Sequence, residues 1–96
     1  PPAETAVLGV LPNPVAGSSA TIRFSLPEAS PVDLAILDVG GRRVRRIQRG
    51  ERLPAGTHSR IWEGRDDTGH RLASGIYFVR LVGADGIHVR KLTLLR

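Results

Sequence analysis

The most apolar run of the sequence is SGIYFVRLV, residues 74–82, which contains the single tyrosine of the chain and one of its two phenylalanines. The two-residue period of a β-strand divides this run into two faces, Tyr77, Val79 and Leu81 against Ile76, Phe78, Arg80 and Val82. The first face can fill a core, and the second is half apolar, which is typical of a central strand. We therefore expect the other strands to pair with this segment or to pack on it. Gly75 begins the segment, where we expect a bulky side chain to hinder the entry turn.

Six further segments have the composition of short strands, separated by turns that contain glycine or proline. They are residues 5–11, 20–26, 32–39, 42–49, 57–63 and 87–96. No segment has a convincing helical period. Seven short strands at regular spacing predict an all-β fold, namely an antiparallel seven-stranded β-sandwich of the immunoglobulin or fibronectin III type.

The segment 42–49 (RRVRRIQR) is the most strongly charged of the predicted strands, and Val44 and Ile47 are its only apolar residues. It follows Gly40-Gly41, which we expect to supply the positive φ angles of a tight hairpin. A charged strand of this kind suits a sheet edge, where it blocks pairing with other chains. A nucleic-acid site here is the less favoured interpretation, because no aromatic residue lies nearby to stack on bases.

The last segment carries two pairs of apolar residues with opposite parity, Ile87 and Val89 against Leu92 and Leu94. A strand that buries both pairs needs one extra residue between them, so we predict a β-bulge near residues 90–91. Such a bulge would turn Lys91 outward beside its neighbours Arg90 and Arg96. The sequence therefore predicts a small basic strip at the end of the chain.

Length and composition limit the class of protein. The 96 residues suffice for one domain with one core, and no cysteine is present to form a disulfide or a thiolate metal site. No apolar run reaches the length of a membrane span. We expect residues 1–10 to form a linker and the start of the first strand, and residues 11–96 to form the sandwich. The net charge of +5 arises mainly from arginines spread along the whole chain, so we interpret them as solvated strand faces.

Residues that carry catalysis or bind metals form no recognisable motif. His58, His70 and His88 lack metal-ligand spacing, and neither a nucleophile elbow nor a glycine-rich phosphate loop is present. The run DDTG at 66–69 lacks the alternating ligands of a calcium loop and is typical of a turn. Trp62 could stack on a sugar, but a lone tryptophan in a small sandwich is more often part of the core. We expect no enzymatic activity, no catalytic residue, no metal and no cofactor.

A series of motifs in fixed order extends over nearly the whole chain. They are NP at 13–14, TIRFSLP at 21–27, DVGGRRV at 38–44, LPAG at 53–56, WEGRDDTG at 62–69, SGIYFV at 74–79 and KLTLL at 91–95. In their order and spacing, the chain resembles the type A C-terminal sorting domain of the type IX secretion system. It is also similar to the related immunoglobulin-like domain of the flagellar hook-capping protein.

The resemblance implies a non-catalytic domain at the end of a larger exported protein. In that family the outer-membrane translocon reads the domain, a sortase-like peptidase commonly removes it, and the cargo is attached to surface lipopolysaccharide. The partners implied are therefore the translocon, the peptidase and an N-terminal cargo domain. From the residues themselves we expect no nucleic-acid partner and no membrane span. The implied location is secreted or on the surface of a Gram-negative-type bacterium, reached through the periplasm. The implied sorting-signal residues are Gly75, Tyr77, Val79, Lys91, Leu92, Leu94 and Leu95.

Two residues depart from the family pattern, and two other functions stay open. Glu63 stands where the family usually has Asp, and Arg60 stands where an apolar residue is usual. If Arg60 points inward, its stem must be buried and its head must reach solvent. The alternatives to sorting are a carbohydrate-binding or adhesive module of an extracellular enzyme and a structural immunoglobulin-like scaffold. Exposure of Trp62 or Tyr77 beside a groove would favour the sugar-binding alternative, and burial of both would weaken it.

Overall fold

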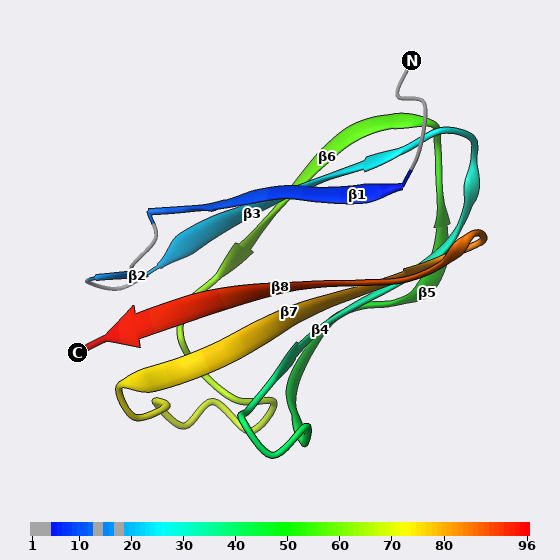
Figure 1. The fold of residues 1–96 in the computed structure, drawn as a ribbon. Helices are drawn as coiled ribbons and strands as arrows, with labels where there is room; N and C mark the ends of the chain where they lie inside the picture. The colour runs from blue at the N-terminus through cyan, green and yellow to red at the C-terminus, as the bar shows by residue number, and fades with distance from the viewer. Residues whose placement is uncertain (1–4, 13–14, 17–18) are drawn as a thin grey trace.

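The computed structural model, which describes residues 5–12, 15–16 and 19–96, places β7 (Gly75–Gly83) inside a five-stranded sheet (Figure 1). Its neighbours are β8 (Gly86–Leu95) and β4 (Ser30–Leu37), both antiparallel to it. The prediction of a central strand is therefore confirmed. The expected linker at residues 1–4 and the motif at 13–14 lie outside the described residues.

Two sheets form the sandwich that Figure 1 shows as an upper and a lower layer. The larger sheet has the order β2-β8-β7-β4-β5, and the smaller has the order β1-β3-β6. The remaining strands are β1 (Ala6–Leu11), β2 (Val15–Ala16), β3 (Ala20–Leu26), β5 (Arg43–Leu53) and β6 (Gly56–Trp62). The described residues contain no helix, and so none that could cross a membrane. The predicted all-β sandwich is confirmed.

Strand β2 is an addition to the seven predicted strands. Val15 and Ala16, which lie outside the seven predicted strands, pair in parallel with Leu94 and Leu95 of β8. All other strand pairs in the two sheets are antiparallel. Two residues are too few to show a strand period, so this pairing has no signal in the sequence.

The core lies between the inner faces of the two sheets and follows the alternation expected from the sequence. The alternating apolar residues of β3, β4 and β7 are all buried, namely Ile22, Phe24, Leu26, Val32, Leu34, Ile36, Tyr77, Val79 and Leu81. Trp62, at the end of β6, is only 1% exposed and belongs to the same cluster. Burying this apolar surface is the main favourable term in folding.

Strand β5 lies at the edge of the larger sheet, as its charged sequence predicts. Val44 and Ile47 are half-buried and pack against the core, while most other residues of β5 are exposed or half-buried. The turn before it is built by Asp38, whose Oδ1 accepts hydrogen bonds from the backbone amides of Gly40 and Arg42. Only Gly41 of the predicted glycine pair has a positive φ, at 83°.

The predicted bulge in β8 is wrong. The pairing of β7 with β8 is continuous from Gly75 opposite Leu94 to Gly83 opposite Gly86. Ile87 and Val89 are 66% and 57% exposed on the outer face of the sheet, so β8 does not bury both apolar pairs. An exposed apolar side chain is common on protein surfaces, and the parity change therefore requires no extra residue.

Candidate functional site

The residues predicted to carry the sorting signal lie together on the antiparallel pair β7 and β8. In the register of this pair, Gly75 lies opposite Leu94, Tyr77 opposite Leu92, and Lys91 opposite Phe78. The structure therefore brings residues from two separate motifs into one two-stranded unit. Their role in sorting stays a prediction.

Four of these residues are core residues. Tyr77 is 8% exposed, and Val79, Leu92 and Leu94 are at most 1% exposed. The Tyr77 hydroxyl donates a hydrogen bond to the Ala73 carbonyl at 2.7 Å. Burial raises the pKa of the Tyr77 phenol, with a smaller contribution from the charge of Asp38. These four side chains hold the strands in place and present no surface that a partner could read.

The remaining three residues lie at or near the surface. Lys91 is exposed on the outer face of β8, and Leu95, on the same face, is 46% exposed. Gly75 is half-buried at the start of β7. A Cβ atom at Gly75 would meet no heavy atom within 4 Å, so the preference for glycine comes from its positive φ of 159° and not from a collision with a neighbour.

The predicted basic strip of Lys91, Arg90 and Arg96 is not formed. Without a bulge, consecutive residues of β8 alternate, so Arg90 faces the side opposite to Lys91. The Arg90 guanidinium donates to the backbone carbonyl of Val7 at 3.0 Å, on the smaller sheet. The Arg96 side chain contacts the loop between β6 and β7 instead.

Arg96 is hydrogen-bonded to the long loop between β6 and β7. Its amide donates to Ser74 Oγ at 2.8 Å, its Nε donates to the Leu72 carbonyl at 2.9 Å, and its Nη2 donates to the Gly64 carbonyl. A Cβ atom at Gly64 would lie 2.6 Å from Nη2 of Arg96. Gly64 also has a φ of 70°, so both the backbone and the contact favour glycine. Sequence patterns gave no sign of this long-range contact.

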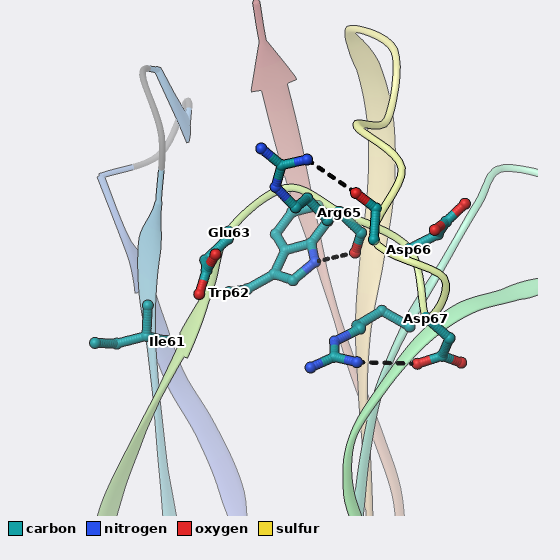
Figure 2. A pocket seen from close by; sticks show the side chains of 8 residues that line it. Ile61, Trp62, Glu63, Arg65, Asp66 and Asp67 are labelled. Carbon is teal, nitrogen blue, oxygen red and sulfur yellow. Dashed lines mark hydrogen bonds and ion pairs between the residues drawn. The ribbon is translucent and has the colours of Figure 1, made fainter.

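The same loop forms one side of a hollow of about 160 Å³ next to Trp62, which Figure 2 shows. The indole Nε1 donates to the Arg65 carbonyl at 3.1 Å, and Arg65 Nη1 in turn donates to the Gly69 carbonyl at 2.9 Å. Across the hollow, Arg45 Nη1 lies 3.2 Å from Asp67 Oδ1. Arg45, Arg65 and Asp67 therefore already have partners within the domain. The Trp62 ring is buried and is not available for stacking.

The DDTG run forms the turn that its sequence predicts. Asp66 Oδ1 accepts hydrogen bonds from the Thr68 amide at 3.0 Å, the Thr68 hydroxyl at 2.8 Å and the His70 amide at 2.9 Å. These bonds, the Thr68 hydroxyl first, lower the pKa of Asp66. Asp67 accepts from the Arg46 amide at 3.0 Å, which lowers its pKa as well. Within the described residues, no group of three or more His, Cys, Asp or Glu side chains could hold a metal ion.

Arg60 lies on the inner face of β6, an edge strand of the smaller sheet, opposite the buried Ile22 of β3. Its half-buried side chain places Cζ 5.9 Å from the centre of the Phe24 ring. Its Nε donates to Gln48 Oε1 at 3.1 Å, and Nη1 donates to the Ser59 carbonyl at 2.8 Å. The half-buried side chain, with its guanidinium near the Phe24 ring and hydrogen-bonded at Nε and Nη1, explains how the sandwich accepts an arginine where the family usually has an apolar residue.

The sequence model of the FlgD Ig-like domain matches residues 13–86 of the chain. The chain belongs to this family. Membership in this family accounts for the sandwich described above and says nothing about catalysis. A search of curated proteins gives no match.

Solved structures share the fold of this FlgD Ig-like domain. PorZ, an essential surface component of the type IX secretion system of Porphyromonas gingivalis, is 22% identical with a TM-score of 0.64, over 92% of this chain and 11% of PorZ. FlgD from P. aeruginosa is 24% identical with a TM-score of 0.62, over 88% of this chain and 68% of FlgD. The Pseudomonas fluorescens alkylpurine DNA glycosylase AlkC, bound to DNA containing an abasic site analog, is 20% identical with a TM-score of 0.57, over 100% of this chain and 32% of AlkC. At these identities the likeness shows the fold alone.

Proposed function

We propose that this FlgD Ig-like domain is a non-catalytic sorting and anchoring domain, which directs a larger exported protein through the type IX secretion system to the cell surface. The observation that carries the proposal is the pairing of β7, which contains Gly75 and Tyr77, with β8, which contains Lys91. The fold shared with PorZ supports it, because PorZ is a surface component of that system. The partners proposed are the outer-membrane translocon, a sortase-like peptidase and an N-terminal cargo domain of the same protein.

In this proposal, buried and exposed residues of β8 have different tasks. Leu92 and Leu94 anchor the strand in the core, and Lys91 and Leu95 offer a charged and an apolar group on the outer face. A partner that recognises the domain must use the exposed groups, because the buried ones cannot be reached without unfolding. The signal would therefore be a surface that the core holds in position.

Export of a reporter tests the proposal. Residues 1–96 are fused to the C-terminus of a periplasm-targeted reporter in a host that has the type IX system. The matched control is the same fusion in a strain whose translocon is inactivated. We expect the reporter in the medium or on the surface only in the first strain. A reporter that stays inside the first strain would contradict the proposal.

A structural scaffold of the flagellar type is the second candidate. It is favoured by the family match over residues 13–86 and by the fold shared with FlgD, of which the chain covers 68%. The complete reading frame discriminates between the two candidates: an enzyme and a signal peptide upstream favour sorting, whereas a flagellar N-terminal region favours the scaffold. The carbohydrate-binding alternative loses support, since Trp62 and Tyr77 are both buried.

A further inference from the structure

A second hollow, of about 310 Å³, lies beside the loop that holds Arg96 and is lined by Glu63, Arg65, Arg71 and Arg96. Arg65 and Arg71 form an isolated antiparallel bridge, which places their side chains on the same face of the loop. Arg96 reaches the hollow from the end of β8. Two segments that are distant in the sequence, the loop between β6 and β7 and the end of β8, therefore deliver three guanidinium groups to one place.

Two of these guanidinium groups are held in position by neutral partners. Arg65 Nη1 donates to the Gly69 carbonyl at 2.9 Å, and Arg96 donates through Nε and Nη2 to the carbonyls of Leu72 and Gly64. A backbone carbonyl fixes the orientation of a guanidinium without cancelling its charge. Each of these two arginines keeps further N–H donors free for a ligand. Gly64 provides the room, since a side chain there would collide with Arg96.

The arginines that line the hollow differ from three arginines of β5 in the charge of their partners. Arg45, Arg46 and Arg49 each form an ion pair with an aspartate of the domain. Among the residues that the structure describes, no ion pair within 4.0 Å involves Arg65, Arg71 or Arg96. With three arginines and one glutamate, the lining has a formal charge of +2 (3 − 1).

We propose that this hollow binds an oxyanion of the phosphate class, free or carried on a larger molecule. Guanidinium groups match the geometry of phosphate oxygens through paired N–H donors, and fixed groups lose little entropy on binding. The volume exceeds what one phosphate needs, so the group that carries the phosphate can lie in the hollow as well. This site is separate from the outer face of β8 and does not depend on the proposed sorting function.

Titration with inorganic phosphate, followed by ¹H–¹⁵N NMR at constant ionic strength, tests the proposal. We expect saturable shifts confined to the amides around residues 63–65, 69–72 and 96. Arg71→Gln and Arg65→Gln should each weaken binding about tenfold, the effect of losing one charge-assisted hydrogen bond. Arg52→Gln is the matched control, because Arg52 is an exposed arginine of β5 outside the hollow, and it should leave the affinity unchanged. Non-saturable shifts, or equal affinity in all variants, would overturn the proposal.

The source of the phosphate group is distinguished in two further arms. Glycerol phosphate is titrated in the same way, and vesicles of phosphatidylcholine with or without phosphatidic acid are tested by co-sedimentation. Sedimentation that requires phosphatidic acid and is lost in Arg71→Gln indicates a lipid headgroup. Saturable binding of glycerol phosphate without sedimentation indicates a soluble phosphorylated ligand. Vesicle binding that Arg71→Gln and Arg52→Gln reduce equally is general attraction to basic surface and counts against the site.

Discussion

Tyr77 combines packing with one specific polar contact. Its ring lies edge-on to Trp62, with 6.0 Å between ring centres, and its hydroxyl bonds to the Ala73 carbonyl. Tyr77→Phe should lower the free energy of unfolding by about 1 kcal/mol, the net value of one hydrogen bond. Tyr77→Ala should lower it by about 3 kcal/mol or more, because it leaves a cavity. Chemical denaturation measures both, with Arg52→Ala as a control expected within about 0.5 kcal/mol of the parent, since Arg52 is exposed. Equal midpoints for all three variants would show that Tyr77 is not a core residue.

Tyr77 also predicts how stability changes in alkali. Burial raises the pKa of the folded phenol, so the folded protein keeps this proton at pH values where the unfolded chain loses it. The stability should therefore fall as the pH rises above about 10, the ordinary pKa of tyrosine. In Tyr77→Phe this part of the loss should be absent. Urea denaturation of the parent and of Tyr77→Phe, between about pH 8 and about pH 11 and so on both sides of that pKa, measures the difference. Equal losses of stability with rising pH in the two proteins would contradict the prediction.

Gly64 and Arg96 form a contact that a double-mutant cycle can test. Gly64→Ala should destabilise the domain by about 1–3 kcal/mol, because a non-glycine residue with positive φ is strained and its Cβ collides with Arg96. In an Arg96→Ala background the collision is gone and only the backbone cost remains. The Gly64→Ala change should then be less costly than in the parent. An identical cost in both backgrounds would show that the side chain of Arg96 does not occupy this place.

At the residue scale, the sequence predicts burial well and long-range polar contacts poorly. The inward positions of Phe24, Leu34 and Val79 follow from the two-residue period alone. The contact of Arg96 with Gly64 joins residues 32 positions apart and leaves no periodic trace. Such a contact depends on how the loop folds back onto the sandwich, which local patterns do not determine.

Strand β8 has one face in the core and one face in solvent, and the two faces predict different mutational effects. Lys91→Glu should change the free energy of unfolding by no more than about 0.5 kcal/mol, because Lys91 is exposed. Leu92→Ala should lower it by about 2–5 kcal/mol, since the side chain is 1% exposed and leaves a cavity. Thermal melts of the two variants measure these effects. Similar melting temperatures would mean that the faces of β8 are assigned the wrong way round.

The loop between β6 and β7 predicts a contribution to stability that is lost in acid. The hydrogen bonds of Asp66 lower its folded pKa, so the unfolded chain takes up a proton at higher pH than the folded protein. This contribution is present above about pH 4 and is lost as the pH falls through the folded pKa. Asp66→Asn keeps an acceptor oxygen but cannot titrate, so its stability should depend less steeply on pH in acid. Denaturation curves between about pH 5 and pH 2 compare the two, and equal slopes would contradict the prediction.

At the element scale, strands with a long alternating pattern were predictable, and two features were not. The expected bulge in β8 rested on the assumption that Ile87 and Val89 are buried, whereas both lie on the outer face. Strand β2 consists of Val15 and Ala16, and its pairing with β8 depends on the tertiary fold. The candidate signal residues were predicted from a resemblance, and the structure divides them into buried and exposed ones.

For the molecule as a whole, the two sheets give the domain a stable core and leave the outer face of β7 and β8 uncovered (Figure 1). On this face, Lys91 lies among the exposed apolar residues Ile76, Val89 and Leu95. We infer that the translocon reads this surface and that the buried motif residues serve the fold. Variants of exposed and buried residues should therefore separate recognition from stability.

The most direct test is the export of a reporter fused to residues 1–96, measured for the parent, Lys91→Glu and Arg52→Glu in a host with the type IX system. Arg52→Glu is the matched control, since it reverses an exposed charge on β5. We predict that the parent and Arg52→Glu reach the medium or the cell surface, whereas Lys91→Glu is exported less while melting at the same temperature. Retention of the parent fusion inside the cells would contradict the sorting function, and full export of Lys91→Glu would contradict the recognition surface.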